Sequence, residues 1–283
     1  MEMIGASQWA RIRQIIRSAL DEDIGSGDVT TDAVLTGGEK GLARAVVKAE
    51  TVVAGIEVFR EVFLIRDPSV EVVLLKKDGE AARAGEIVAE VSGKLASILT
   101  AERVALNLFQ RMCGIAALTR RYVEGTKGTK AKILDTRKTV PGLRVLDKYA
   151  VRAGGGFNHR VGLYDGVLIK DNHISAAGGI TKAVARIPGR APMMVRVEVE
   201  VRNLDEVREA LLSGAHVIML DNMSTEDMRR AVDLIAGRAL VEASGNVTVD
   251  RVKEIAGTGV DFISTGAITH SAAAADISLK VRT

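Results

Sequence analysis

Between residues 131 and 264 the chain repeats one pattern, in which a short apolar run ends in polar or glycine residues and a helical segment follows. Six such runs are present: Lys132–Thr136, Gly166–Lys170, Val195–Val201, His216–Leu220, Ala239–Ala243 and Asp261–Ser264. Asp221, Glu242 and Ser264 recur about every twenty residues, the length of one strand-loop-helix unit. Such units predict a parallel sheet or an α/β barrel.

The run Val195–Val201 distinguishes these two architectures. Its valines alternate with Arg196, Glu198 and Glu200, so one face of the strand is apolar and the other is charged. A central strand of an open doubly wound sheet is apolar on both faces. We therefore predict an open α/β barrel of fewer than eight strands with polar groups inside, and we assign Arg196 to a structural ion pair.

The first part of the chain has a different texture. Helical patterns and short β-like runs alternate at Ser7–Leu20, Ala43–Lys48, Val70–Leu75, Glu86–Val91 and, after a capping Thr100, at Ala101–Glu124. We predict an α+β, sandwich-like N-terminal domain over residues 1–115 and an α/β barrel over 116–270. The tail, 271–283, is expected to pack back on the first domain.

Composition excludes several classes of function. Hydrophobic residues make up 47% of the chain, yet no apolar stretch approaches the ~18–20 residues of a membrane span. We expect no membrane partner and no signal peptide. The net charge is only +3 and aromatic residues are 3%, so no nucleic-acid partner is expected either. Cys113 is the only cysteine, which fits a reducing cytoplasm.

In α/β barrels the active site assembles at the carboxyl ends of the strands. Here every such end carries polar or small residues: Thr136-Arg137-Lys138, Lys170, Glu200, Asp221, Ser244-Gly245-Asn246 and Thr265-Gly266-Ala267, with His159-Arg160 between the first two strands. We predict that these segments line one shared site.

The cations of this set predict an anionic ligand. Arg137, Lys138, Arg160 and Lys170 would balance a substrate with several phosphate or carboxylate groups. Pairing with neighbouring carboxylates must satisfy part of this charge, because unpaired buried charges are costly.

The two small-residue turns, Ser244–Asn246 and Thr265–Ala267, can present backbone N–H groups to a phosphate. The alternative is that their glycines only allow a tight turn. Their position after the last two strands favours a phosphate site.

Several residues keep alternative roles open. His159 can contact substrate or be structural. Lys170 can bind an anion or form a Schiff base. Glu200 and Asp221 can hold ribose hydroxyls or a hydrated Mg²⁺, or form salt bridges. The segment Asp78–Gly93 resembles a biotinyl or lipoyl hairpin only superficially, since its turn has no lysine.

Motifs along nearly the whole chain resemble the quinolinate phosphoribosyltransferase family, the carboxylating nicotinate-nucleotide pyrophosphorylases. They are Gly27–Thr31, Thr100–Arg103, Leu134–Thr139, Gly154–Arg160, Gly162–Asp165, Ile169–His173, Glu198–Glu200, Leu220–Asn222, Glu242–Asn246 and Thr265–Ser271. The resemblance implies a pentosyltransferase that uses quinolinate, 5-phosphoribosyl 1-pyrophosphate and Mg²⁺. It would form nicotinate mononucleotide, pyrophosphate and CO₂ in de novo NAD biosynthesis.

The resemblance also implies residue roles. Quinolinate and neighbouring phosphoryl groups would contact Arg103, Arg137, His159, Arg160 and Lys170, with Thr136 and Lys138 beside them and Lys138 facing the pyrophosphate. Glu200 and Asp221 would hold ribose hydroxyls and Mg²⁺, directly or through water. The 5-phosphate would contact Ser244, Gly245, Asn246, Thr265, Gly266 and Ala267, with His270 nearby. The catalytic residues would be Lys138, Lys170, Glu200 and Asp221.

A cytoplasmic homodimer or hexamer is further implied, with Arg103 of one subunit entering its partner's site. Three alternatives stay open at this point: a paralogous, molybdenum-associated phosphoribosyltransferase-like protein, a Schiff-base lyase using Lys170, and a non-catalytic carrier module.

Overall fold

The computed structural model describes residues 5–282. They form two compact units. The first contains the residues through Arg120, Thr139–Gly155 and the residues from Ser271 onward, and the second contains Arg121–Lys138 and Gly156–His270. Along the chain, the second unit is therefore inserted into the first. The division differs from the expected 1–115 and 116–270, because Thr139–Gly155 makes its contacts within the first unit.

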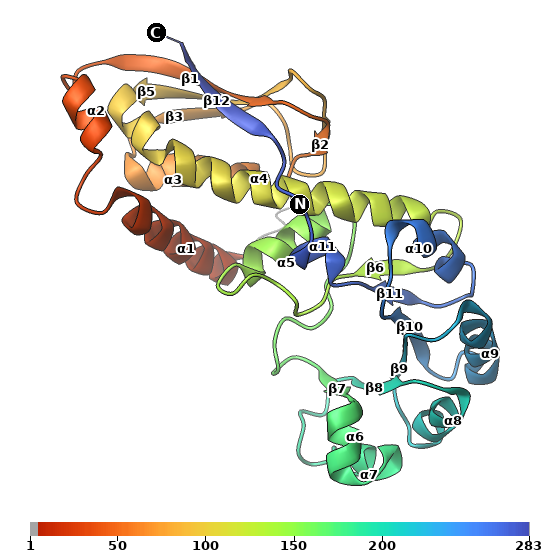
Figure 1. Cartoon of the computed structure of the whole chain (residues 1–283). Coiled ribbons are helices and arrows are strands. Elements are labelled where there is room, and N and C mark those ends of the chain that lie inside the picture. The colour runs from red at the N-terminus through yellow and green to blue at the C-terminus, as the bar shows by residue number, and fades with distance from the viewer. Residues whose placement is uncertain (1–4, 283) are drawn as a thin grey trace. The chain divides into compact units, whose positions relative to one another are not determined.

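The first unit is built on a four-stranded antiparallel sheet in the order β12-β1-β5-β3 (Figure 1). Its strands are β1 (Lys40–Val47), β3 (Glu71–Leu74), β5 (Ile87–Lys94) and β12 (Ile277–Arg282). A short pair, β2 (Thr51–Val52) with β4 (Ala81–Ala82), is separate from this sheet. The helices are α1 (Ala6–Ile24), α2 (Val29–Val34), α3 (Ile56–Arg66), α4 (Leu95–Gly125) and α5 (Arg144–Ala153).

Helix α4 begins earlier than the sequence pattern predicted. It starts at Leu95, directly after β5, because Leu95 and Ile98 extend its buried apolar face toward the N-terminus. Thr100 therefore lies inside the helix and is not its cap. Its Oγ1 donates a hydrogen bond to Oδ2 of Asp28 at 3.1 Å, and Asp28 in turn caps α2 by accepting from the backbone N–H of Thr31.

The tail after Ser271 belongs to the first unit. Strand β12 pairs antiparallel with β1 over six residue pairs, from Leu42–Arg282 to Val47–Ile277. Before β12, the tail crosses α4 at Gly114, where a Cβ atom would lie 1.9 Å from the carbonyl oxygen of Ala273. Glycine is unfavourable inside a helix, but here it allows this close approach of two backbones.

The second unit is a six-stranded parallel sheet in the order β6-β11-β10-β9-β8-β7. Its strands are β6 (Lys132–Leu134), β7 (Val167–Ile169), β8 (Val197–Val201), β9 (Val217–Asp221), β10 (Leu240–Ser244) and β11 (Phe262–Ser264). Its helices are α6 (Asp171–Ala177), α7 (Ile180–Ala185), α8 (Leu204–Leu212), α9 (Thr225–Ile235), α10 (Val249–Ala256) and α11 (Ala267–His270). Its first two strands in the chain, β6 and β7, lie at opposite edges and do not pair with each other, so the sheet stays open. This confirms the predicted open α/β barrel.

Strand register decides which side chains face the inside of this sheet. Glu200 lies beside Met219, and Met219 lies beside Glu242. These three residues line the interior, while Val199 is buried on the opposite face of β8. The alternation seen in the sequence thus places carboxylates inside the barrel. Arg196, by contrast, is exposed and forms no ion pair within residues 5–282, so the structural ion pair predicted for it is wrong.

No helix in residues 5–282 is long and apolar enough to span a membrane.

Substituting Gly114 tests the crossing of the tail over α4. Gly114→Ala should lower the free energy of unfolding by about 2–3 kcal/mol, because the added methyl group must displace the backbone of Ala273. Gly38→Ala is the control, since its Cβ would meet no heavy atom within 4 Å. Chemical denaturation followed by circular dichroism measures both. Equal, small changes in the two variants would contradict the close contact.

Candidate active site

The carboxyl ends of the parallel strands surround a cavity of about 730 Å³ that is lined by the second unit. Fifteen of its lining residues belong to the site predicted from sequence: Thr136, Arg137, Lys138, His159, Arg160, Lys170, Glu200, Asp221, Ser244, Gly245, Asn246, Thr265, Gly266, Ala267 and His270. Arg103, the remaining member of that set, is exposed on α4 in the first unit and does not line this cavity.

Seven further residues line the cavity and had no predicted role: Leu168, Met219, Asn222, Glu242, Val247, Thr248 and Ser264. The period of two along each strand could have identified Met219, Glu242 and Ser264 as inward-facing, because they share a face with predicted residues. Leu168 and Val247 form an apolar part of the cavity wall, and nothing in the sequence distinguished them from core residues.

Two guanidinium groups concentrate positive charge on one side of the cavity. Arg160 is held by its Nη1, which donates to the carbonyl of Gly166 at 2.9 Å. Burial and the nearby charge of Arg137 lower the pKa of Arg160 from its ordinary value. Cations that disfavour each other in this way are stabilised by an anion between them.

Lys170 lies at the end of β7, where its Nζ forms an ion pair with Oε2 of Glu200 at 3.1 Å. Glu200 comes from the neighbouring strand β8. This ion pair balances part of the positive charge at the cavity rim, as predicted from the sequence.

A buried carboxylate positions the segment that carries His159 and Arg160. Asp135, at the end of β6, is fully buried and accepts hydrogen bonds from Nδ2 of Asn158 at 2.6 Å and from the backbone N–H of His159 at 2.9 Å. Phe157 also donates its backbone N–H to Ile133 at 2.8 Å, so this segment runs beside β6. The imidazole of His159 is thereby directed into the barrel.

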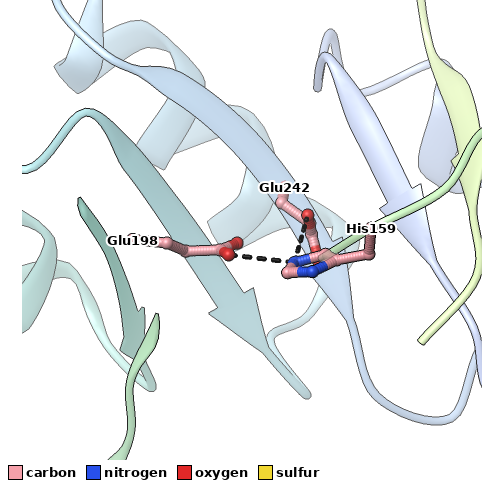
Figure 2. A group of neighbouring side chains, drawn as sticks. All are labelled: His159, Glu198 and Glu242. Atoms are coloured by element: carbon pink, nitrogen blue, oxygen red, sulfur yellow. Dashed lines mark hydrogen bonds and ion pairs between the residues drawn. The ribbon is translucent and has the colours of Figure 1, made fainter. Parts of the chain in front are cut away.

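Inside the barrel, His159 meets two glutamates (Figure 2). Its Nε2 lies 2.9 Å from Oε2 of Glu198 and 3.7 Å from Oε2 of Glu242. Its Nδ1 accepts the backbone N–H of Arg160 at 2.8 Å. Burial, followed by the charge of Glu198, raises the pKa of Glu242 to about 8.

The two small-residue turns approach the cavity closely. At Gly245, where φ is +87°, a Cβ would lie 2.4 Å from Oδ1 of Asn222. At Gly266, a Cβ would lie 2.8 Å from Cδ of Lys138 and 2.9 Å from Cδ2 of His270. A side chain at either glycine would therefore force these cavity residues to shift, and Gly245 in addition has the positive φ that a tight turn needs.

Backbone strain gathers at the same place. Asn222 and Asn246 adopt φ values of 54° and 47°, and Nδ2 of Asn246 donates to Oδ1 of Asn222 at 3.0 Å. In residues 5–282 only one other non-glycine residue, Ala236, has a positive φ. Left-handed non-glycine residues are unfavourable and cluster at ligand sites.

Two sets of side chains could hold a metal ion. Glu200 and Asp221 offer carboxylate oxygens to the cavity, the ligands that Mg²⁺ prefers when substrate phosphates complete its coordination. His159, Glu198 and Glu242 form a second set, with potential ligand atoms within 4.8 Å of one another. In that set, however, the Nδ1 of His159 accepts an N–H, which leaves the ring proton on Nε2 and no lone pair there for a metal.

Comparison with known proteins matches both units of this architecture. The family model for the C-terminal domain of quinolinate phosphoribosyl transferase matches residues 115–280, and the model for its N-terminal domain matches residues 28–113. The chain is 44% identical to a probable carboxylating nicotinate-nucleotide pyrophosphorylase of Bacillus subtilis and 46% identical to one of Synechocystis. Each alignment covers 96% of this chain and 93% of the relative.

Solved structures agree in fold. The NadC structure from Streptococcus pyogenes superposes with a TM-score of 0.93 at 42% identity, and the nicotinate-nucleotide pyrophosphorylase from Francisella tularensis with 0.91 at 41%. Each superposition covers 96% of both chains. With both domain models matched and relatives this similar over more than nine-tenths of their length, the chain belongs to the quinolinate phosphoribosyltransferase family.

Proposed function

We propose that this enzyme transfers phosphoribosyl from 5-phosphoribosyl 1-pyrophosphate to quinolinate, with loss of CO₂, and so makes nicotinate mononucleotide for NAD biosynthesis. One observation carries the proposal: paired cations, two carboxylates and two close-approach glycine turns surround a single cavity in a chain of this family. The cavity of about 730 Å³ lies within the usual range for small-molecule sites.

The cationic side suits quinolinate. Its two adjacent carboxylates require two donors with fork geometry, and Arg137 and Arg160 provide guanidinium groups close enough to affect each other's charge. Lys170 adds a point charge at the same rim, with His159 and Thr136 beside it.

The side with the glycine turns suits the 5-phosphate. Ser244–Asn246 and Thr265–Ala267 line the cavity, where their backbone N–H groups would bind the phosphate, and a side chain at Gly245 or Gly266 would crowd Asn222 or Lys138. His270 lies beside Gly266 and would contact the same phosphate.

The carboxylates of Glu200 and Asp221 would bind the ribose hydroxyls and Mg²⁺. When bound, Mg²⁺ supplies positive charge to the pyrophosphate leaving group. Lys138 stands on the same rim and would neutralise further negative charge as pyrophosphate departs.

The transfer itself needs no protein nucleophile. The pyridine nitrogen of quinolinate attacks the anomeric carbon while the bond to pyrophosphate breaks, and the site holds the two anions in line. When the adjacent carboxylate then leaves as CO₂, its electron pair stays on the ring carbon beside the positively charged nitrogen, which stabilises it. A proton from solvent adds to that carbon and completes nicotinate mononucleotide.

The chemical rivals are disfavoured by the same residues. Cys113 is buried, and burial raises the pKa of its thiol to about 12, so it cannot serve as a thiolate. Lys170 is engaged by Glu200 as an ion pair, whereas a Schiff base requires a free amine. The full cationic set also argues against a paralogous, molybdenum-associated role.

Assembly completes the proposal. We infer a cytoplasmic homodimer, or a hexamer, in which the exposed Arg103 of one subunit reaches the quinolinate site of its partner. Support comes from the exposure of Arg103 on α4 and from its place in the motif Thr100–Arg103, which resembles the family's site motif.

The direct test is an assay of CO₂ and pyrophosphate release from quinolinate and 5-phosphoribosyl 1-pyrophosphate. Release of both products in equal amounts, dependent on added Mg²⁺, is expected. Nicotinate serves as the control acceptor and should give neither product. Turnover of nicotinate but not quinolinate would reassign the substrate.

Mixing two inactive variants tests the shared site. Arg103→Ala and Arg137→Ala should each lower kcat/KM for quinolinate by about 100-fold, because each removes a charge-assisted contact. Subunit exchange between them creates one intact site per heterodimer, so activity should return in the mixture. Arg229→Ala, on the exposed surface of α9, is the matched control. Absence of recovery despite heterodimer formation would place Arg103 outside the partner's site.

Gly245 tests the phosphate side. Gly245→Ala places a methyl group against Asn222, so it should raise KM for 5-phosphoribosyl 1-pyrophosphate about tenfold with little change in KM for quinolinate. Gly237→Ala is the matched control, since it also has a positive φ but open space around its Cβ. Steady-state kinetics with each substrate varied separates the two. A larger rise in KM for quinolinate than for 5-phosphoribosyl 1-pyrophosphate would show that Gly245 does not belong to the phosphate site.

A further inference from the structure

One buried cluster is left unexplained by the transfer reaction. His159, Glu198 and Glu242 meet inside the barrel, and the two glutamates are 6% and 1% exposed (Figure 2). The Oε1 atoms of both glutamates lack a hydrogen-bond partner within residues 5–282. Two buried carboxylates with unpartnered oxygens require a positive charge or a proton.

His159 cannot supply enough charge. Its Nδ1 accepts the backbone N–H of Arg160, so the ring carries its one hydrogen on Nε2 and is neutral. That single N–H points at Oε2 of Glu198 at 2.9 Å, and Oε2 of Glu242 lies farther away at 3.7 Å. A carboxylate oxygen of Glu242 lies within 4.8 Å of one of Glu198, and two buried carboxylates this close repel each other unless one of them holds a proton.

We infer that Glu242 carries a proton in the folded enzyme and acts as a positioning residue, which holds Glu198 against the imidazole of His159 and keeps the cluster at a single negative charge.

The surroundings explain why Glu242 is the protonated member. Within β10 and its neighbours it faces Met219 of β9, and Phe262 and Ser264 of β11, none of them charged. The charged or titratable groups near it are Glu198 and His159. Glu198, in contrast, has the guanidinium of Arg160 and the Nε2 of His159 near it.

The consequence concerns the substrate. His159, Arg160 and Glu242 all line the cavity that, under the proposed function, receives the quinolinate dianion. A second negative charge behind His159 would repel that dianion and weaken the field of Arg160. The proton on Glu242 thus keeps the cationic side of the cavity attractive to carboxylates.

Thermal denaturation of Glu242→Gln tests the proton without relying on the reaction. The pKa of Glu242 rises from 4.5 to about 8 on folding, so its contribution to stability is complete below about pH 4.5 and is lost as pH rises toward 8. Glutamine mimics the protonated acid and does not titrate. The Tm of Glu242→Gln relative to wild type should therefore increase steadily from about pH 5 to about pH 8. Glu226→Gln, an exposed control on α9, should show no such trend.

Kinetics tests the role in substrate binding and rests on the proposed function. At about pH 7, Glu242→Gln should keep kcat/KM for quinolinate within about 3-fold of wild type, whereas Glu242→Ala should lose far more through KM. Between about pH 7 and about pH 9, the ratio of Glu242→Gln to wild-type kcat/KM should rise about tenfold, as wild-type Glu242 ionises.

Two outcomes would overturn the inference. A Tm difference between Glu242→Gln and wild type that does not change with pH would show that Glu242 is ionised in the folded state. Stabilisation of wild type by added Zn²⁺, absent in Glu242→Gln, would assign the cluster to a metal ion. If quinolinate were not a substrate, the pH dependence of Tm would still decide the protonation of Glu242.

Discussion

The second unit depends on holding charge inside a parallel sheet. Strands β8, β9 and β10 turn their aliphatic residues outward to the helices and their carboxylates inward, so Glu198, Glu200 and Glu242 share an interior where hydrophobic side chains would ordinarily lie. Such an interior is stable only if each carboxylate has a partner. Lys170 forms an ion pair with Glu200, and the imidazole of His159 contacts Glu198. The contacts that stabilise the charged interior therefore also hold cavity residues in place.

The loop from Phe157 to Arg160 links these contacts. Asp135 anchors it at the end of β6, and the loop then delivers one neutral ring to the acidic interior and one guanidinium to the cavity wall. A buried carboxylate that does not line the cavity thus sets the positions of two residues that do. The two glycine turns shape the cavity in a different way. Because Gly245 and Gly266 have no side chains, they leave room for Asn222, Lys138 and His270.

Much of this could be predicted from sequence because strand period and chemistry coincide in the barrel. The alternation of Val195–Val201 indicated a charged interior, and the polar ends of the six strands identified the cavity residues. The sequence could not show that Thr139–Gly155 joins the first unit or that α4 begins at Leu95, since both depend on contacts with distant residues. Glu242 stood out in the sequence, but no role could be assigned to it. Whether a glutamate is protonated or ionised depends on its surroundings in the fold, which the sequence does not show.

The pairing of β12 with β1 bears on how the protein is made. Residues 40–47 leave the ribosome long before residues 277–282. During most of synthesis, β1 therefore lacks its partner β12 on one edge. The inserted barrel, whose strands all lie between residues 132 and 264, can form its own sheet in that interval. Strands β1, β5 and β3 can pair as soon as residues 40–94 are made, and only the edge pairing of β1 with β12 must wait for the end of synthesis.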